Sequence, residues 1–154
     1  MVDDSLGAIA LISIHPRFAD AILAGTKRVE FRKVCFKREI SHALLYATAP
    51  VQKVVGYVEI TEIDERSPEA LWRRYREVAG IERQAFFAYY RGKVTGVALK
   101  VRRPRRLAHP LALGDVQRGA TPPQSFVYST MDVLRRVAEP SLGRAAARTR
   151  REPR

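Results

Sequence analysis

One short segment places a lysine, a glutamate and an arginine at K-x-x-E-x-R spacing within six residues. Positions 25–32 read Gly-Thr-Lys-Arg-Val-Glu-Phe-Arg, a G-x-K-x-x-E-x-R pattern. The guanidinium of Arg32 could hold a phosphate or a base edge in its planar fork, and the carboxylate of Glu30 could accept from a base amino group. Lys27 suits a phosphate contact or, in an enzyme, the role of nucleophile or base. The segment therefore predicts a binding or catalytic site.

The backbone decides whether these three side chains meet. Glu30 and Arg32 are two residues apart on an expected strand, so they share a face. Lys27 precedes Glu30 by three residues, a separation that puts side chains on opposite faces of a regular strand. A turn at Gly25, or a bulge, would bring Lys27 to the same side. The alternative is a solvated Glu30–Arg32 pair worth about 0–1 kcal/mol, with Lys27 facing solvent at a helix C-terminus.

Five further residues are candidate nucleic-acid contacts. Tyr46 and Thr48 share a face of a later expected strand, where Tyr46 could stack on a base and Thr48 could hydrogen-bond one. Core packing is an equal alternative for Tyr46. Tyr90 is the aromatic residue of its expected helix that is best placed to reach a cleft. Arg102 and Arg103 begin a basic run that could follow a phosphate backbone, or could be a solvated strand edge.

Short strands and helices are expected to hold these residues. The apolar run at 8–14 predicts a buried strand, and Pro16 starts a helix that ends at Gly25. His15, beside Pro16, fits a helix cap or a phosphate contact. Gly56 indicates a bulge or a close backbone approach. Further strands are expected at 27–34, 43–48, 54–63, 94–107 and 126–129, helices at 67–80, 82–90 and 131–137, and a loop at 109–124.

This order of elements predicts the fold class. The helices interrupt the strands without alternating regularly with them, which excludes a doubly wound α/β sheet. It favours an α+β fold, namely a small mixed or antiparallel β-barrel with helices packed outside. A length of 154 residues suits one domain with a real core. We expect that domain to cover residues 1–139, followed by a disordered Arg-rich tail at 140–154.

Composition limits the cofactors and the location. No run approaches the roughly 18 apolar residues that span a bilayer, and the acidic start of the chain differs from a secretory signal. Cys35 is the single cysteine, and no Cys/His cluster has zinc spacing. We therefore expect no membrane association, no metal, no cofactor and a cytoplasmic location.

The net charge of +12 favours a polyanionic partner, because each neutralised phosphate releases counterions. The alternative source of this charge is a GC-rich genome, whose codons enrich arginine and alanine without selection for binding. Charge alone does not separate the two.

The order of these features resembles the ASCH domain, a member of the PUA-like superfamily of small β-barrels, from about residue 12 to about residue 129. The resemblance rests on the segment 25–32, on Tyr-Ala-Thr-Ala-Pro at 46–50, Val-Gly at 55–56, Leu-Trp at 71–72, Tyr-Tyr-x-Gly at 89–92, Gly-Val-Ala-Leu at 96–99 and Pro-Pro-Gln-Ser-Phe at 122–126. It implies a pseudo-barrel of five or six strands with a cleft near the helix-to-strand junction. It also implies binding of RNA or modified nucleobases, and a role in RNA metabolism or in regulating translation or transcription.

We therefore predict a domain that binds RNA or another nucleic acid, with a nucleobase or phosphate cleft. Its predicted contacts are Lys27, Glu30, Arg32, Tyr46, Thr48, Tyr90, Arg102 and Arg103. The first alternative is an enzyme with Lys27 and Glu30 as its catalytic pair, either a ribonuclease or a hydrolase of a modified nucleoside. A third class is a protein-interaction module that uses the Arg-rich tail.

The hydrolase alternative comes from the resemblance. Some small ASCH members resemble amidohydrolases that act on acylated cytidine with a lysine, a glutamate and a nearby threonine. That threonine is replaced here by Glu30. The sequence does not rank the further acids Glu59, Glu62 and Asp64 as its partner.

Overall fold

Six strands form one curled, mixed sheet. The structure is a computed structural model that describes residues 6–139. The strands are β1 (Leu6–Ile14), β2 (Val29–Arg32), β3 (His42–Ala47), β4 (Lys53–Arg66), β5 (Gly96–Leu111) and β6 (Phe126–Thr130). Their order across the sheet is β2-β5-β4-β3-β1-β6. β1 and β3 run parallel, and the other neighbouring pairs run antiparallel. The α+β fold class is confirmed.

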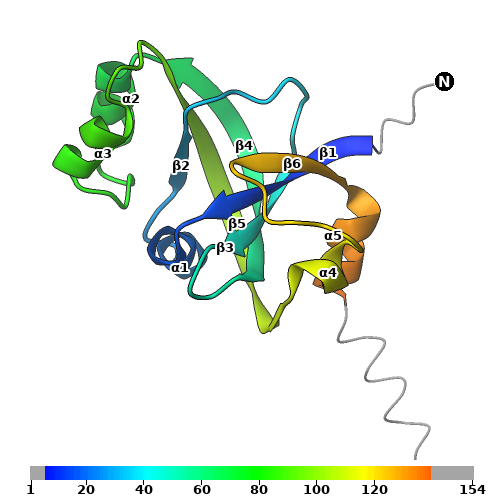
Figure 1. Cartoon of the computed structure of the whole chain (residues 1–154). Helices are drawn as coiled ribbons and strands as arrows, with labels where there is room; N and C mark the ends of the chain where they lie inside the picture. Colours follow the sequence, from blue (N-terminus) through cyan, green and yellow to red (C-terminus); the bar gives the residue numbers. More distant parts are fainter. Residues whose placement is uncertain (1–5, 140–154) are drawn as a thin grey trace, which may run out of the picture.

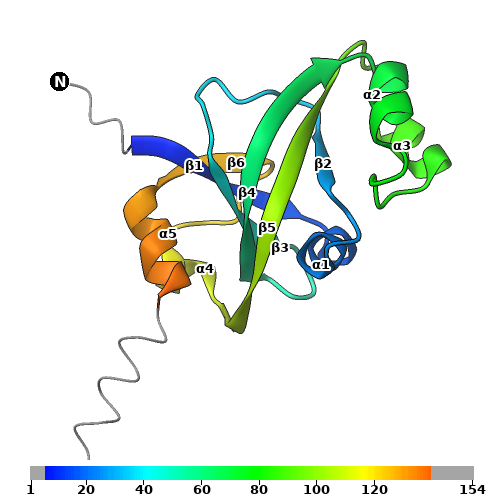
Figure 2. The same cartoon turned by 180° about the vertical axis from the view of Figure 1, so that it is seen from behind.

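Within residues 6–139, five helices lie around this sheet. They are α1 (Pro16–Ala24), α2 (Pro68–Tyr75), α3 (Arg83–Tyr89), α4 (Leu113–Val116) and α5 (Met131–Ala138). α2 and α3 lie on the side of β2, whereas α4 and α5 lie on the opposite side of the molecule (Figure 1). Seen from behind, β4 and β5 form a long bent antiparallel pair that reaches from α2 almost to α4 (Figure 2). The predicted barrel is therefore a curled half-barrel with its helices packed outside.

Local sequence signals explain where α1 begins and ends. Pro16 occupies the first turn, and the His15 side chain caps the helix by accepting a hydrogen bond from the Arg17 N–H at 3.2 Å. Gly25 ends the helix in the left-handed region at φ 84°, which favours glycine. The turn that follows leads directly into β2, so α1 and β2 meet at a fixed corner.

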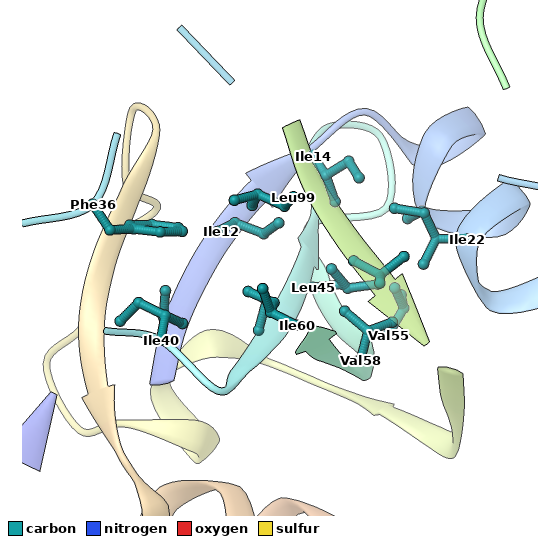
Figure 3. Packing of buried hydrophobic residues seen from close by; sticks show 14 of the residues in the cluster. Ile12, Ile14, Ile22, Phe36, Ile40, Leu45, Val55, Val58, Ile60 and Leu99 are labelled. Atoms are coloured by element: carbon teal, nitrogen blue, oxygen red, sulfur yellow. The ribbon is translucent and has the colours of Figure 1, made fainter. Parts of the chain in front are cut away.

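Three apolar clusters hold the elements together. The largest fills the inside of the curled sheet and includes Ile12, Ile22, Leu45, Val58 and Leu99 (Figure 3). A second joins the outer face of β1 and β3 to α4 and α5, and a third joins β2 and β5 to α2 and α3. Full burial of such side chains stabilises the fold by roughly 1.5–3 kcal/mol each.

Two expected element boundaries were wrong. The predicted loop at 109–124 instead contains the end of β5 and the short helix α4. This helix buries the side chains of Leu113 and Val116, but four residues are too few to show a helical period of apolar residues in the sequence. α2 ends at Tyr75 rather than near Gly80, because the chain turns there with a Val78 N–H to Tyr75 O bond of 2.9 Å. The predicted tail at 140–154 lies outside the described residues.

The expectation for Gly56 was confirmed. A Cβ added at Gly56 would lie 2.5 Å from the Arg105 backbone oxygen and 2.6 Å from a Leu23 methyl carbon. The pairings of β4 with β3 and with β5 also shift register beside this residue. Gly56 therefore lets the long β4–β5 pair bend over α1.

Candidate functional site

A pocket of about 510 Å³ opens where α1 meets β2. Its size falls within the range of ligand sites in proteins. Its lining comes from the end of β1, from α1, from β2, from the segment around α3 and from the segment before β6. The lining residues are Ser13, Ile14, His15, Phe18, Lys27, Glu30, Phe31, Arg32, Lys33, Val34, Ile81, Phe86, Tyr89, Gln124 and Ser125. Lys27, Glu30 and Arg32 of the 25–32 segment therefore line one pocket.

Lys27 reaches the pocket because it precedes the strand. It lies in the turn between α1 and β2, where its N–H donates to the Ala21 carbonyl at 3.1 Å. The side chain is only 2% exposed, and its Nζ donates a hydrogen bond to the Ala79 carbonyl. Nζ also lies 5.0 and 5.1 Å from the ring centroids of Phe18 and Phe31, within cation–π range. Lys27 is therefore a buried cation, not a solvent-facing residue.

Glu30 faces the inside of the curled sheet. It pairs with Leu99 of β5, whereas its neighbours Val29 and Phe31 pack against α2 and α3. Glu30 is 5% exposed, and its Oε1 accepts a hydrogen bond from the Phe31 N–H at 2.8 Å. The solvated ion pair considered above is therefore absent, and Glu30 lies at the floor of the pocket.

Burial shifts both groups toward their neutral forms. Desolvation lowers the pKa of Lys27, although the nearby Glu30 carboxylate opposes this change and Arg17 adds to it. Desolvation raises the pKa of Glu30, opposed by Lys27, by Arg32 and by the Phe31 N–H. Each group therefore changes its protonation state more readily near neutral pH than it would in water. Such shifts are common where acid–base chemistry or polar recognition occurs.

A change of Glu30→Gln tests the burial of this carboxylate. The pKa of Glu30 is raised on folding, so the native state binds the extra proton and loses stability as pH rises above the ordinary value of 4.5. We expect the melting temperature of the wild type to fall relative to that of Glu30→Gln between about pH 4.5 and pH 7. Circular dichroism at several pH values measures this. The prediction fails if the melting temperatures of the wild type and of Glu30→Gln change equally with pH. It also fails if the exposed control Glu77→Gln has the same effect as Glu30→Gln.

The Arg32 guanidinium, predicted to contact a phosphate or a base edge, donates hydrogen bonds to protein acceptors in this structure. Its Nη1 donates to the Ser13 carbonyl at 3.0 Å, and its Nη2 donates to the Ser125 carbonyl at 2.9 Å and to Ser125 Oγ at 2.7 Å. Its Nε is buried and has no hydrogen-bond partner in the described part of the chain. These hydrogen bonds of the Arg32 guanidinium link the edge strand β2 to the end of β1 and to the segment before β6. Arg32 forms a wall of the pocket, and the predicted phosphate contact would have to compete with these bonds.

The two candidate tyrosines do not reach the pocket. Tyr46 is 4% exposed and packs in the outer cluster under α4 and α5, because both faces of β3 are covered. Tyr90 is 2% exposed, and its O–H lies within hydrogen-bond distance of the Arg32 and Val97 carbonyls, at 2.9 and 3.2 Å. Thr48 is half-buried beyond the end of β3 and is absent from the pocket lining. Base stacking by either ring would require the core to open.

The basic run on β5 also lies away from the pocket. Arg102 and Arg103 are exposed and both pair with Glu59, at 2.6 and 3.5 Å. The further acids Glu62 and Asp64 pair with Arg74 at 3.2 and 2.9 Å. Glu30 is therefore the one acid among the pocket-lining residues. Nucleic-acid contact by Arg102 and Arg103 stays a prediction for a separate surface.

Sequence reasoning missed several pocket residues. Phe18 and Ser125 both line the pocket, although neither was among the predicted contacts. The Ser125 hydroxyl accepts a hydrogen bond from Arg32. Tyr89 and Gln124 lie far from Lys27 in sequence, and no local signal connects them to it.

Among residues 6–139, no group of three or more His, Cys, Asp or Glu side chains is placed to hold a metal ion, and no helix is long and apolar enough to cross a membrane. A shallow depression of about 970 Å³ lies over α2 and α3, lined by residues such as Glu82 and Phe87, and none of the candidate site residues contributes to it.

Comparisons with known proteins find similar sequences and similar folds. The model of the ASCH domain family matches residues 12–105. A protein of Zymomonas mobilis described as an ASCH domain-containing ribonuclease is 34% identical over 122 residues, which cover 77% of this chain and 82% of that protein. The crystal structure of ASCH from Zymomonas mobilis has a TM-score of 0.78 at 29% identity, over 85% of this chain and 94% of that chain. The N-terminal domain of Staphylothermus marinus McrB shares the fold, with a TM-score of 0.57 at 10% identity over 86% and 94% of the two chains.

Proposed function

The chain belongs to the ASCH domain family, and on that premise we propose that it binds single-stranded RNA and takes one unpaired nucleobase into the pocket of Lys27 and Glu30. The observation that carries this proposal is the meeting of a buried ammonium and a buried carboxylate in one open pocket. A base edge carries adjacent donors and acceptors, which match such a pair. The Phe18 and Phe31 rings beside Lys27 offer apolar contact to a base.

The rim of the pocket supports phosphate binding. Arg17 stacks on Phe18 with 4.7 Å from its guanidinium carbon to the ring centroid, and Lys33 lies 4.6 Å from the centroid of Tyr89. Both cations are exposed. By contrast, several exposed arginines elsewhere, such as Arg102 and Arg106, have carboxylate partners. Among residues 6–139 no carboxylate pairs with Arg17 or Lys33, so a single strand entering the pocket would meet unpaired positive charge beside it.

Replacing Lys27 tests this proposal most directly. Lys27→Met keeps the length of the side chain but removes the ammonium, and we expect RNA affinity to fall about tenfold, a loss of about 1.4 kcal/mol. Fluorescence anisotropy with a labelled single-stranded RNA and its DNA counterpart measures the effect and shows which polymer is preferred. Lys100→Met removes the same charge from the exposed face of β5 and should change affinity less than about twofold.

Two results would contradict the proposal. One is an equal loss of RNA affinity in Lys27→Met and Lys100→Met. This result would indicate general attraction between opposite charges and no contact in the pocket. The other is an affinity for RNA that does not fall as salt increases, because phosphate binding releases counterions.

A ribonuclease is the second candidate function, favoured by the named activity of the relative from Zymomonas mobilis. The opposite pKa shifts of Lys27 and Glu30 would suit proton transfer at the cleaved bond. Incubation of labelled RNA with the wild type tests for cleavage, and a panel of acylated cytidines tests the amidohydrolase alternative. In an enzyme, Lys27→Met should abolish turnover while binding falls only in part. No turnover by the wild type on either panel would leave a binding domain.

A further inference from the structure

The loop after α2 lies along the whole side chain of Lys27. The Arg28 N–H donates to the Val78 carbonyl at 2.9 Å, beside the main chain of Lys27. At the other end, the Lys27 ammonium donates to the Ala79 carbonyl. Gly80 lies against the aliphatic carbons between these two points. Residues 78–80 therefore cover Lys27 from its backbone to its charge.

Gly80 leaves no room for a side chain. A Cβ added there would lie 2.6 Å from Lys27 Cβ, 2.7 Å from Cγ and 3.0 Å from Cδ. Real Cβ atoms essentially never approach other atoms this closely, so one of the two segments would have to move. Gly80 also has φ +61°, a conformation that residues with a side chain rarely adopt.

The end of α2 from which this loop leaves is fixed by a buried carboxylate. Asp64, at the end of β4, accepts hydrogen bonds from the Tyr75 O–H at 2.7 Å and from Arg74 at 2.9 Å, both on α2. Arg66 donates to the same carboxylate at 2.7 Å. An added Cβ at position 80 would clash with Lys27 Cβ, whose position the backbone fixes, so the loop and the turn that carries Lys27 would have to move apart. Movement of either segment separates the Lys27 ammonium from the Ala79 carbonyl that accepts its hydrogen bond.

We propose that Gly80 is a positioning residue for the Lys27 ammonium, and that its missing side chain lets the loop hold this charge at the floor of the pocket. The consequence for RNA binding rests on the function proposed above. The position of the ammonium in the free protein does not depend on that function. The two can therefore be tested separately.

A matched pair of glycines provides the experiment. Gly80→Ala adds a methyl group against Lys27, whereas Gly92→Ala adds one at φ +77° with no heavy atom within 4 Å. Both variants carry a similar backbone strain, so only the contact with Lys27 differs. The first readout is the side-chain NMR signal of Lys27 in the free protein, identified as the signal absent from Lys27→Met. The rings of Phe18 and Phe31 shift this signal while Nζ stays 5.0 and 5.1 Å from their centroids.

We expect Gly80→Ala to move the Lys27 signal toward that of an exposed lysine and to lower RNA affinity about tenfold, as Lys27→Met does. Gly92→Ala should do neither. In the Lys27→Met background, Gly80→Ala should cause no further loss of affinity, because the group that it displaces is already gone. If Gly80→Ala does not fold, Asp64→Asn replaces it, since loosening the loop should move the same signal in the same direction.

An unmoved Lys27 signal in the folded variant would overturn the positioning role. The positioning role would also be overturned if Gly80→Ala lowered RNA affinity equally in the wild type and in the Lys27→Met background. A wild-type protein that binds no RNA would instead overturn the proposed function, and the NMR result in the free protein would still decide the role of Gly80.

Discussion

Replacing Arg32 by methionine is expected to lower the free energy of unfolding by about 3 kcal/mol. The change removes three hydrogen bonds from one guanidinium and leaves the carbonyls of Ser13 and Ser125 without these donors. Hydrogen bonds to a charged group contribute about 1.5–3 kcal/mol each, and the total is reduced here because Arg32 is only half-buried. Urea denaturation followed by circular dichroism measures the change.

Two variants show whether the loss comes from this bridge. Arg102→Met removes an exposed arginine that pairs with Glu59 across neighbouring strands, and it should lower the free energy of unfolding far less than Arg32→Met does. Arg32→Lys keeps the charge, but a single ammonium lacks the fork that reaches both carbonyls, so we expect an intermediate loss. If Arg32→Met and Arg102→Met unfold at the same urea concentration, Arg32 does not hold the two ends of the sheet together.

The sequence predicted the elements near the site well because their boundaries carry strong local signals. Pro16 and Gly25 mark the two ends of α1, and alternation in β2 separates Phe31 from its charged neighbours. The turn at Gly25 was the condition for Lys27 to join Glu30, and the structure meets it. Membership of the ASCH family, also predicted from sequence, is confirmed.

The parts that the sequence did not predict depend on contacts between distant segments. Arg32 has the pattern of a phosphate ligand, but its acceptors at Ser13 and Ser125 become visible only once the sheet curls. Tyr46 alternates correctly on its strand, yet α4 and α5 cover the face to which it points. The charge of Arg102 is offset by Glu59, its partner across the β4–β5 pair.

The pocket combines one segment that has a local sequence pattern with distant segments that have none. The 25–32 segment supplies the floor through Lys27 and Glu30 and one wall through Arg32. The other walls come from the segment around α3 and from the residues before β6, which no local pattern connects to that floor. The stability of the pocket should therefore depend on residues of α3 that carry no charge.

Phe86→Ala is expected to have the largest effect on stability, about 3–5 kcal/mol. Phe86 is fully buried and its ring contacts those of Phe31, Trp72 and Tyr90, with centroids 4.8, 5.1 and 5.0 Å away. The truncation would leave a cavity between α3 and β2 that these rings can fill only in part. Urea or thermal denaturation measures the loss, which is large beside the 5–15 kcal/mol that typically stabilises a domain.

Phe87→Ala is the matched control, because the neighbouring ring is half-buried at the outer surface of α3. It should cost clearly less than Phe86→Ala. Phe86 also lines the pocket and packs on Phe31, which lies beside the Lys27 ammonium. We therefore expect the fraction of Phe86→Ala that stays folded to bind RNA more weakly than Phe87→Ala does. Equal stability of the two variants would mean that α3 does not support the wall of the pocket.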